Sequence, residues 1–322
     1  MSDKTGIEWT DATWNPVTGC TEVSPGCDHC YAKTFAERFR GTEGHYFERG
    51  FDVQLRPEKL EQPLKWARPR RIFVNSMSDL FHDSVPDEYI ARVWAIMARS
   101  PQHTFQVLTK RHARMRSLLG SRSFRDEFEL FTPSQLIGPW PLPNVWLGVS
   151  TESQQWADIR IPALLATPAV VRFISAEPLL GHIELYGSPS QPGPAIVRTG
   201  VQTRPSTPDG PAEYDYDDQF GLDWVIVGGE SGHGARPMDP EWVRSLRDEC
   251  RATGTAFLFK QWGEYAPICR LAVSDGQVTH RCRCRGANPS HPVDIRRVGK
   301  KIAGREFDGR TWDEYPEVPD AI

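Results

Sequence analysis

The chain has 322 residues, and its 39% hydrophobic and 25% charged residues suit a folded protein with a substantial core rather than a disordered chain. A net charge of −4 argues against a broad basic face for duplex nucleic acid. No apolar run approaches the roughly 20 residues that span a bilayer, and the chain starts without an apolar signal region. The sequence therefore predicts a cytoplasmic protein without a membrane partner.

Three of the seven cysteines lie close together near the N-terminus, in the pattern C-x6-C-x2-C formed by Cys20, Cys27 and Cys30. An odd number of cysteines without an export signal favours metal or cluster ligation over disulfides. Structural zinc and iron–sulfur sites normally take four protein ligands, so three thiolates leave one coordination position open to a cofactor or substrate. A zinc site completed by His29 or Asp28 is the alternative, because the sequence does not identify the metal.

Beyond the cysteines, short β-branched or aromatic runs alternate with helical stretches. The runs lie at 72–74, 103–108, 144–149, 170–174, 222–227 and 256–259. Each run ends in polar or glycine-rich residues, and Pro86 opens a helix whose apolar stripe includes Tyr89, Val93 and Met97. At least six such units predict an α/β fold with parallel strands, arranged as a full or partial βα (TIM-like) barrel. A doubly wound open sheet is the alternative, because periodicity does not report barrel closure.

Two stretches interrupt this pattern, at about 187–221 and at about 269–295. The first is rich in Pro, Gly, Ser and Asp, and neither has the composition of a domain linker. We therefore predict a single domain, 1–322, with two insertions. The second stretch contains a candidate for a second metal site, made of Cys269, His280, Cys282, Cys284 and His291.

Polar residues follow the ends of the predicted strands, where βα barrels bind their ligands. The candidate binding residues are Asn75, Ser76, Ser78, Asp79, Ser150, Glu177, Gly228, Gly229 and Glu230. Glu177, which precedes a proline, and Lys260, at the end of the last predicted strand, are the candidate catalytic residues. Ser78 and Asp79 are equally well explained as helix caps, and capping is the favoured explanation for Ser150.

The cysteine segment resembles the cluster loop of radical S-adenosylmethionine (SAM) enzymes, although their commonest spacing is C-x3-C-x2-C. The longer first gap and the motifs along the rest of the chain resemble the phage Gp37/Gp68 family, also described as three-Cys-motif (DUF5131) proteins. The resemblance covers almost the entire chain. Its motifs lie at 10–16, 75–81, 108–111, 228–232, 260–263 and 303–312.

The resemblance implies a radical SAM-type barrel that carries a [4Fe–4S] cluster on Cys20, Cys27 and Cys30. The fourth iron would bind SAM, and an electron from the cluster would cleave SAM to methionine and a 5′-deoxyadenosyl radical. The strand-end residues from Asn75 to Glu230 would contact SAM. The implied partners are SAM, a reductant such as flavodoxin or ferredoxin, a three-Cys-motif partner protein, and a nucleotide or nucleic acid base as substrate.

Two other functions stay open. The first is a non-catalytic metal-binding interaction protein of a phage or mobile-element system, which would hold zinc rather than iron. The second is a barrel hydrolase that uses Glu177 and Glu230, and activity that survives the loss of Cys27 would favour it. The eleven tryptophans are also ambiguous, because they can stack on bases or pack against the barrel.

Overall fold

A sheet of seven parallel strands forms the centre of the computed structural model, which describes residues 5–185, 187–188, 191–192, 221–269, 273–274, 277–278 and 293–317. In sheet order the strands are β1 (Ala12–Trp14), β4 (Arg71–Val74), β5 (Thr104–Thr109), β6 (Val145–Ser150), β7 (Val171–Ala176), β10 (Trp224–Gly228) and β11 (Ala256–Gln261). Sheet order equals chain order, and every neighbouring pair is parallel. Within the described residues the edge strands β1 and β11 do not pair, so the sheet is an open half-barrel.

This strand order distinguishes the predicted architectures. A doubly wound sheet reverses its strand order at a switch point, whereas a barrel adds each new strand on the same side. The prediction of a partial βα barrel is therefore confirmed, and the alternative of a doubly wound sheet is wrong. The sequence pattern identifies six of these seven strands. It misses β1, because three residues are too few to show a period.

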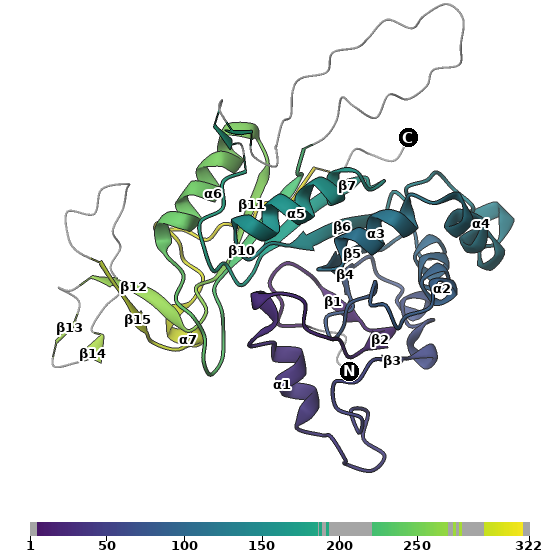
Figure 1. The fold of residues 1–322 in the computed structure, drawn as a ribbon, viewed down its shortest axis with the longest axis horizontal. Coiled ribbons are helices and arrows are strands. Elements are labelled where there is room, and N and C mark those ends of the chain that lie inside the picture. Colours follow the sequence, from purple (N-terminus) through teal and green to yellow (C-terminus); the bar gives the residue numbers. More distant parts are fainter. Residues whose placement is uncertain are drawn as a thin grey trace, which may run out of the picture.

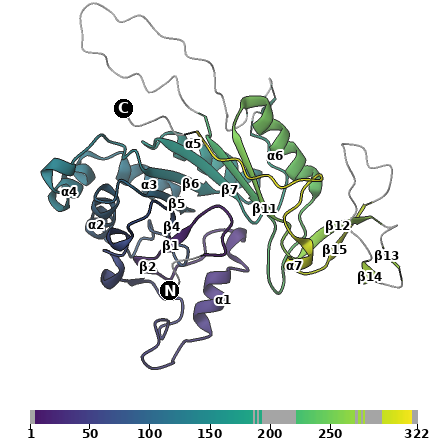
Figure 2. The same ribbon diagram turned by 180° about the vertical axis from the view of Figure 1, so that it is seen from behind.

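Helices and short turns connect the strands. The α-helices are α1 (Tyr31–Glu37), α2 (Asp87–Ala98), α3 (His112–Leu119), α4 (Arg122–Phe131), α5 (Gln154–Leu165), α6 (Pro240–Thr253) and α7 (Lys300–Ala303). The 3-10 turns are η1 (Pro25–Cys27), η2 (Pro57–Lys59), η3 (Pro63–Lys65) and η4 (Ser134–Leu136). Short strands pair as β2 (Val17–Thr18) with β3 (Gln54–Leu55), β8 (Gly187–Ser188) with β9 (Gln191–Pro192), β12 (Tyr265–Cys269) with β15 (Val293–Arg297), and β13 (Val273–Ser274) with β14 (Gln277–Val278). Figure 1 shows α1 apart from α5 and α6, and Figure 2 shows the same separation from behind.

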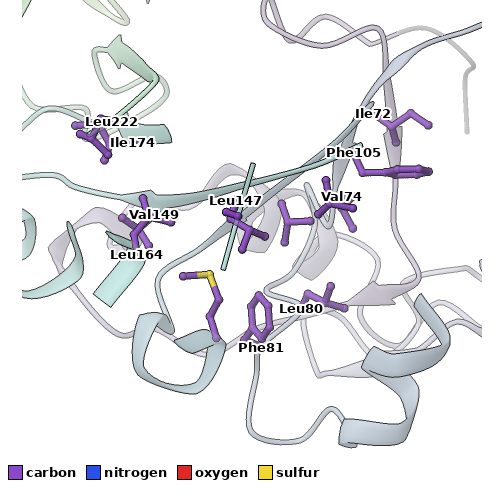
Figure 3. Packing of buried hydrophobic residues seen from close by; sticks show 14 of the residues in the cluster. Ile72, Val74, Leu80, Phe81, Phe105, Leu147, Val149, Leu164, Ile174 and Leu222 are labelled. Atoms are coloured by element: carbon purple, nitrogen blue, oxygen red, sulfur yellow. The ribbon is translucent and has the colours of Figure 1, made fainter. Parts of the chain in front are cut away.

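The larger core lies between the sheet and the helices that follow its strands. In this layer α5 packs against β6 and β7, α6 packs against β11, and α2 contacts α4. Residues of β6 alternate between the larger core, which takes Leu147 and Val149, and the opposite face, which takes Trp146. Figure 3 shows Leu147 and Val149 beside other members of this core. The apolar stripe predicted for α2 is buried here, and so is Cys250 of α6.

An aromatic layer covers the opposite face of the sheet. Trp9 packs against Phe73 and Trp224, with ring centroids 4.6 and 6.1 Å apart. Trp224 also packs against Trp146, at 6.0 Å. Eight of the eleven tryptophans are buried in this layer or in the larger core. Buried tryptophans do not stack on bases, so these eight give no support for a nucleic acid surface.

Some local expectations need correction or fall outside the described residues. Ser150 is the last residue of β6, and α5 begins at Gln154 after Ser153, so Ser150 does not cap a helix. Most of both predicted insertions, and the candidate second metal site around Cys282 and Cys284, lie outside the described residues. The single-domain organisation stays a prediction. Among the described helices, none combines the length and the apolar character needed to cross a membrane.

Candidate functional site

A cavity of about 450 Å³ opens at the C-terminal ends of the parallel strands. Twelve of the residues predicted from the sequence line it, namely Cys20, Cys27, Cys30, Asn75, Ser76, Ser78, Asp79, Ser150, Glu177, Gly229, Glu230 and Lys260. Gly228 is not part of the lining, but a Cβ at this position would lie 3.2 Å from Glu177 Cδ. The volume suits a small molecule or cofactor. The fold therefore brings the cysteine segment and the ends of β4 to β7, β10 and β11 to one place.

Residues 19–30, which we term the cysteine loop, are fastened at their start by the turn after β4. Gly19 N donates to the Met77 carbonyl oxygen at 2.9 Å. Ser78 Oγ donates to the Val17 carbonyl oxygen at 2.7 Å. The Ser78 hydroxyl therefore ties the base of the cysteine loop to the sheet, and the cofactor contact of Ser78 stays a prediction.

A buried ion pair supports the middle of the cysteine loop. Glu152 Oε2 accepts a hydrogen bond from Arg160 Nη1 at 2.9 Å, and the exposed fractions of the two side chains are 2% and 0%. Glu152 Oε1 accepts a hydrogen bond from Gly26 N at 3.3 Å. A Cβ at residue 26 would lie 3.1 Å from Glu152 Cδ, so glycine permits this close approach. The sequence analysis assigns no role to Arg160. The signal that could have identified it is its helical spacing from Ala157 and Ile161, which places an arginine on the buried side of α5.

A second ion pair links the cysteine loop to the end of β10. The Arg236 guanidinium donates to both oxygens of Glu230, from Nε at 2.9 Å and from Nη2 at 2.7 Å. It also donates to Asp28 Oδ2 and to the Pro25 carbonyl oxygen, each at 2.9 Å. Arg236 therefore ties the cysteine loop to the cavity wall. Asp28 Oδ2 is engaged by this contact, and His29, the other predicted zinc ligand, lines the cavity, so the zinc alternative stays a prediction.

Arg111 contacts the first cysteine of the loop. Its Nη1 lies 3.5 Å from Cys20 Sγ and 3.7 Å from Asp79 Oδ2. Its Nη2 donates to Thr21 Oγ1 at 2.7 Å. Burial, with the Asp79 charge second, raises the pKa of the Cys20 thiol to about 11, and the Arg111 charge opposes this rise. Arg111 is thus placed to stabilise a thiolate at Cys20.

Both carboxylate oxygens of Asp79 accept hydrogen bonds from the chain. Its Oδ1 accepts from Phe81 N at 3.0 Å and from Thr109 Oγ1 at 2.7 Å. Its Oδ2 accepts from Lys110 N at 3.0 Å. These contacts join the ends of β4 and β5. Asp79 does not cap a helix, because α2 begins at Asp87 after Pro86, and its predicted cofactor contact stays a prediction.

Asn75 differs from Asp79, because it lines the cavity with an amide whose Nδ2 and Oδ1 have no partner among the described residues. The residue is 3% exposed, and its φ of +62° lies in the left-handed region that Asn tolerates better than most residues. A buried amide without partners costs free energy in the folded chain. An unpaired buried group on a strained backbone is typical of a position that meets a ligand.

Lys260 and Glu177 form an ion pair inside the cavity, with Nζ 2.6 Å from Oε1. The pair connects the ends of β11 and β7. At the neighbouring end of β10, a Cβ on Gly229 would lie 2.0 Å from the Trp262 carbonyl oxygen. Glycine at 229 therefore allows the chain ends of β10 and β11 to pack closely, a structural reason that accompanies its place in the cavity lining.

The described residues contain no group of three or more His, Cys, Asp or Glu side chains placed to hold a single metal ion. A [4Fe–4S] cluster binds each thiolate to a different iron, so its ligands need not converge on one point. Cys20, Cys27 and Cys30 are free thiols. The kind of metal is therefore inferred from the three cysteine sulfur atoms and not from a preformed site for a single ion.

The fold and the site define an α/β protein with a half-barrel sheet and a cysteine-lined cavity at the C-terminal ends of its strands. A family model described as "Protein of unknown function (DUF5131)" matches residues 4–316. The chain therefore belongs to the DUF5131 family, which confirms that part of the resemblance and assigns no activity. No curated protein and no solved structure matches the chain significantly.

Proposed function

We propose that this protein is a radical SAM enzyme that holds a [4Fe–4S] cluster on Cys20, Cys27 and Cys30. The observation that carries the proposal is the shared cavity, which the three cysteines line together with polar residues from six strand ends. Barrel-type α/β enzymes bind their cofactors at this end of the sheet. Together with the resemblance to radical SAM cluster loops, the shared cavity supports cluster chemistry beside a space for a second molecule.

The donor set suits such a cluster. The cysteine loop supplies three sulfur ligands, and Arg236 engages Asp28 Oδ2 beside them. Ligation removes the proton from each thiol, and the Arg111 guanidinium, 3.5 Å from Cys20 Sγ, would stabilise the negative charge that results. Charges and hydrogen bonds at the sulfurs also tune the reduction potential of iron–sulfur clusters. Arg111 would therefore affect both the assembly and the potential of the cluster.

The buried amide of Asn75 fits a contact with SAM, because it offers one donor group and one acceptor that the described chain does not use. Ser76 and Ser150 add polar groups to the same cavity. SAM bound at a reduced cluster supplies the chemistry, a reductive cleavage that yields methionine and a 5′-deoxyadenosyl radical. The task of the chain is to orient SAM and the substrate and to exclude water.

Lys260 and Glu177 are the proposed catalytic residues. A lysine ammonium group held by a carboxylate can donate a proton from Nζ to a substrate in the cavity. The alternative of a hydrolase would need Glu177 and Glu230 as a pair of acid and base. Each of them forms an ion pair with its own cation, so no observation favours that alternative.

The remaining parts of the proposal concern partners. A flavodoxin or ferredoxin would reduce the cluster, a three-Cys-motif partner protein would act with the enzyme, and the substrate would be a nucleotide or a nucleic acid base. A cytoplasmic location belongs to the same proposal, because thiolate ligands and a reduced cluster suit a reducing compartment.

Anaerobic reconstitution with iron and sulfide tests the proposal. The wild-type protein should bind about four irons per chain. After addition of dithionite and SAM, it should form 5′-deoxyadenosine, which mass spectrometry detects. Cys27→Ser should lose both the cluster and the product. Cys250→Ala is the matched control, because Cys250 is buried in α6 outside the cavity lining, and it should keep both.

The outcomes separate the candidate functions. A fully loaded cluster that neither binds nor cleaves SAM would refute the radical SAM proposal. Zinc in place of iron, with no gain of iron on reconstitution, would support a non-catalytic metal-binding interaction protein instead.

A further inference from the structure

The carboxylates that line the cavity are all paired with cations. The pairs and their N–O distances are Asp79–Arg111 (3.7 Å), Glu177–Lys260 (2.6 Å) and Glu230–Arg236 (2.7 Å). A paired carboxylate contributes little to the neutralisation of a further cation nearby. In the metal-free protein with neutral thiols, the cations outside these pairs are therefore the ones available to an anionic ligand in the cavity.

Two such cations line the cavity. Lys110 follows β5, and Lys300 begins α7. In the part of the chain that the structure describes, neither ammonium group forms an ion pair or a hydrogen bond. Their backbones are nevertheless hydrogen-bonded, because Lys110 N donates to Asp79 Oδ2 and the Lys300 carbonyl oxygen accepts from Gly304 N, each at 3.0 Å. The two lysines reach one cavity from distant parts of the sequence.

We propose that Lys110 and Lys300 bind a phosphate group of the substrate. Two ammonium groups without carboxylate partners can pair with both negative charges of one phosphate monoester, whereas a carboxylate offers only one. Lysine acts toward phosphate as a point charge, so its flexible side chain suits this task. The inference rests on the proposed function in placing the substrate in the same cavity, and it assigns that substrate to phosphorylated molecules such as nucleotides.

Calorimetric titration of the metal-free protein with AMP and with adenosine tests the inference, because the two ligands differ only in the phosphate. AMP should bind about tenfold more tightly than adenosine, and added salt should reduce this difference. Lys110→Gln and Lys300→Gln should each remove most of the difference and leave adenosine binding unchanged. Lys301→Gln is the matched control, because Lys301 is the next residue of α7, is exposed as Lys300 is, and is not part of the cavity lining.

Wild-type protein that binds AMP no more tightly than adenosine would overturn the inference, and so would an equal effect of Lys301→Gln. Inorganic phosphate should compete with AMP, and equal competition by acetate would overturn the assignment to phosphate. The titration uses neither iron nor SAM, so its result is independent of 5′-deoxyadenosine formation. Lysine-dependent AMP binding would stand even if SAM were not cleaved, and SAM cleavage without lysine-dependent AMP binding would remove only this inference.

Discussion

Glu152→Gln removes one charge of the buried ion pair beneath the cysteine loop and keeps the shape of the side chain. Arg160 is then left without its carboxylate, and in the described structure its Nε and Nη2 have no hydrogen-bond partner. Its Nη1 still donates to the Ser150 carbonyl oxygen at 2.8 Å, and its guanidinium carbon lies 4.2 Å from the centroid of the Trp156 ring. Removal of one partner from a buried pair costs about 3–5 kcal/mol. We expect about 3 kcal/mol, because the Gln amide oxygen still accepts a hydrogen bond.

Urea unfolding of the metal-free, reduced protein measures this loss, with tryptophan fluorescence as the signal. The midpoint should fall at an unchanged slope. The matched control is Glu88→Gln, which removes the same group from an exposed pair with Arg92 on α2. That pair has side chains that are 53% and 48% exposed, so its loss should cost no more than about 0.5 kcal/mol.

Equal midpoints for Glu152→Gln and Glu88→Gln would refute the reasoning. They would mean that the Ser150 carbonyl oxygen and the Trp156 ring stabilise the Arg160 charge without a carboxylate. A loss of stability with an unchanged iron content would separate the two roles of Glu152. In that case, its contact with Gly26 N would not be needed to place the cysteine loop.

Three further changes test other contacts of the described chain. Gly26→Ala places a methyl group against the neighbouring carboxylate, so iron affinity should fall about tenfold with little change in the urea midpoint, and unchanged iron binding would contradict this. Arg236→Gln leaves the buried Glu230 carboxylate without its cation and frees the cysteine loop, so we expect a loss of about 2–3 kcal/mol together with a lower iron content on reconstitution. Burial opposes ionisation of Asp308, but hydrogen bonds from two arginines of α6 hold the pKa of Asp308 below its ordinary value of 3.8. The stability that this carboxylate contributes is therefore present above about pH 4 and is lost as the pH falls through its lower folded-state pKa. Asp308→Asn should destabilise the protein at neutral pH, and the difference in stability from wild type should vanish in acid.

Most of the candidate site is predictable from the sequence, because its residues lie at positions with local signals. The cysteine spacing identifies Cys20, Cys27 and Cys30 without any knowledge of the fold. The polar ends of the predicted strands identify Asn75 and Lys260, since parallel strands end at one edge of a sheet. The local signals do not separate a residue that faces a ligand from one that holds the chain, and Asp79 and Ser78 show this, because both line the cavity with side chains already bound to the chain.

The contacts that hold the cysteine loop and set the charge of the cavity are decided by the tertiary structure. Arg236 meets the cysteine loop, and Lys300 reaches the cavity, only after strands distant in sequence have come together. The sequence by itself determined the alternation of strands and helices and the open coordination of three cysteines, because periodicity and spacing are local properties. Closure is not local, so the sequence left a full barrel, a half-barrel and a doubly wound sheet open. The pairing of seven strands in chain order, with edges that do not meet within the described residues, decided for the half-barrel.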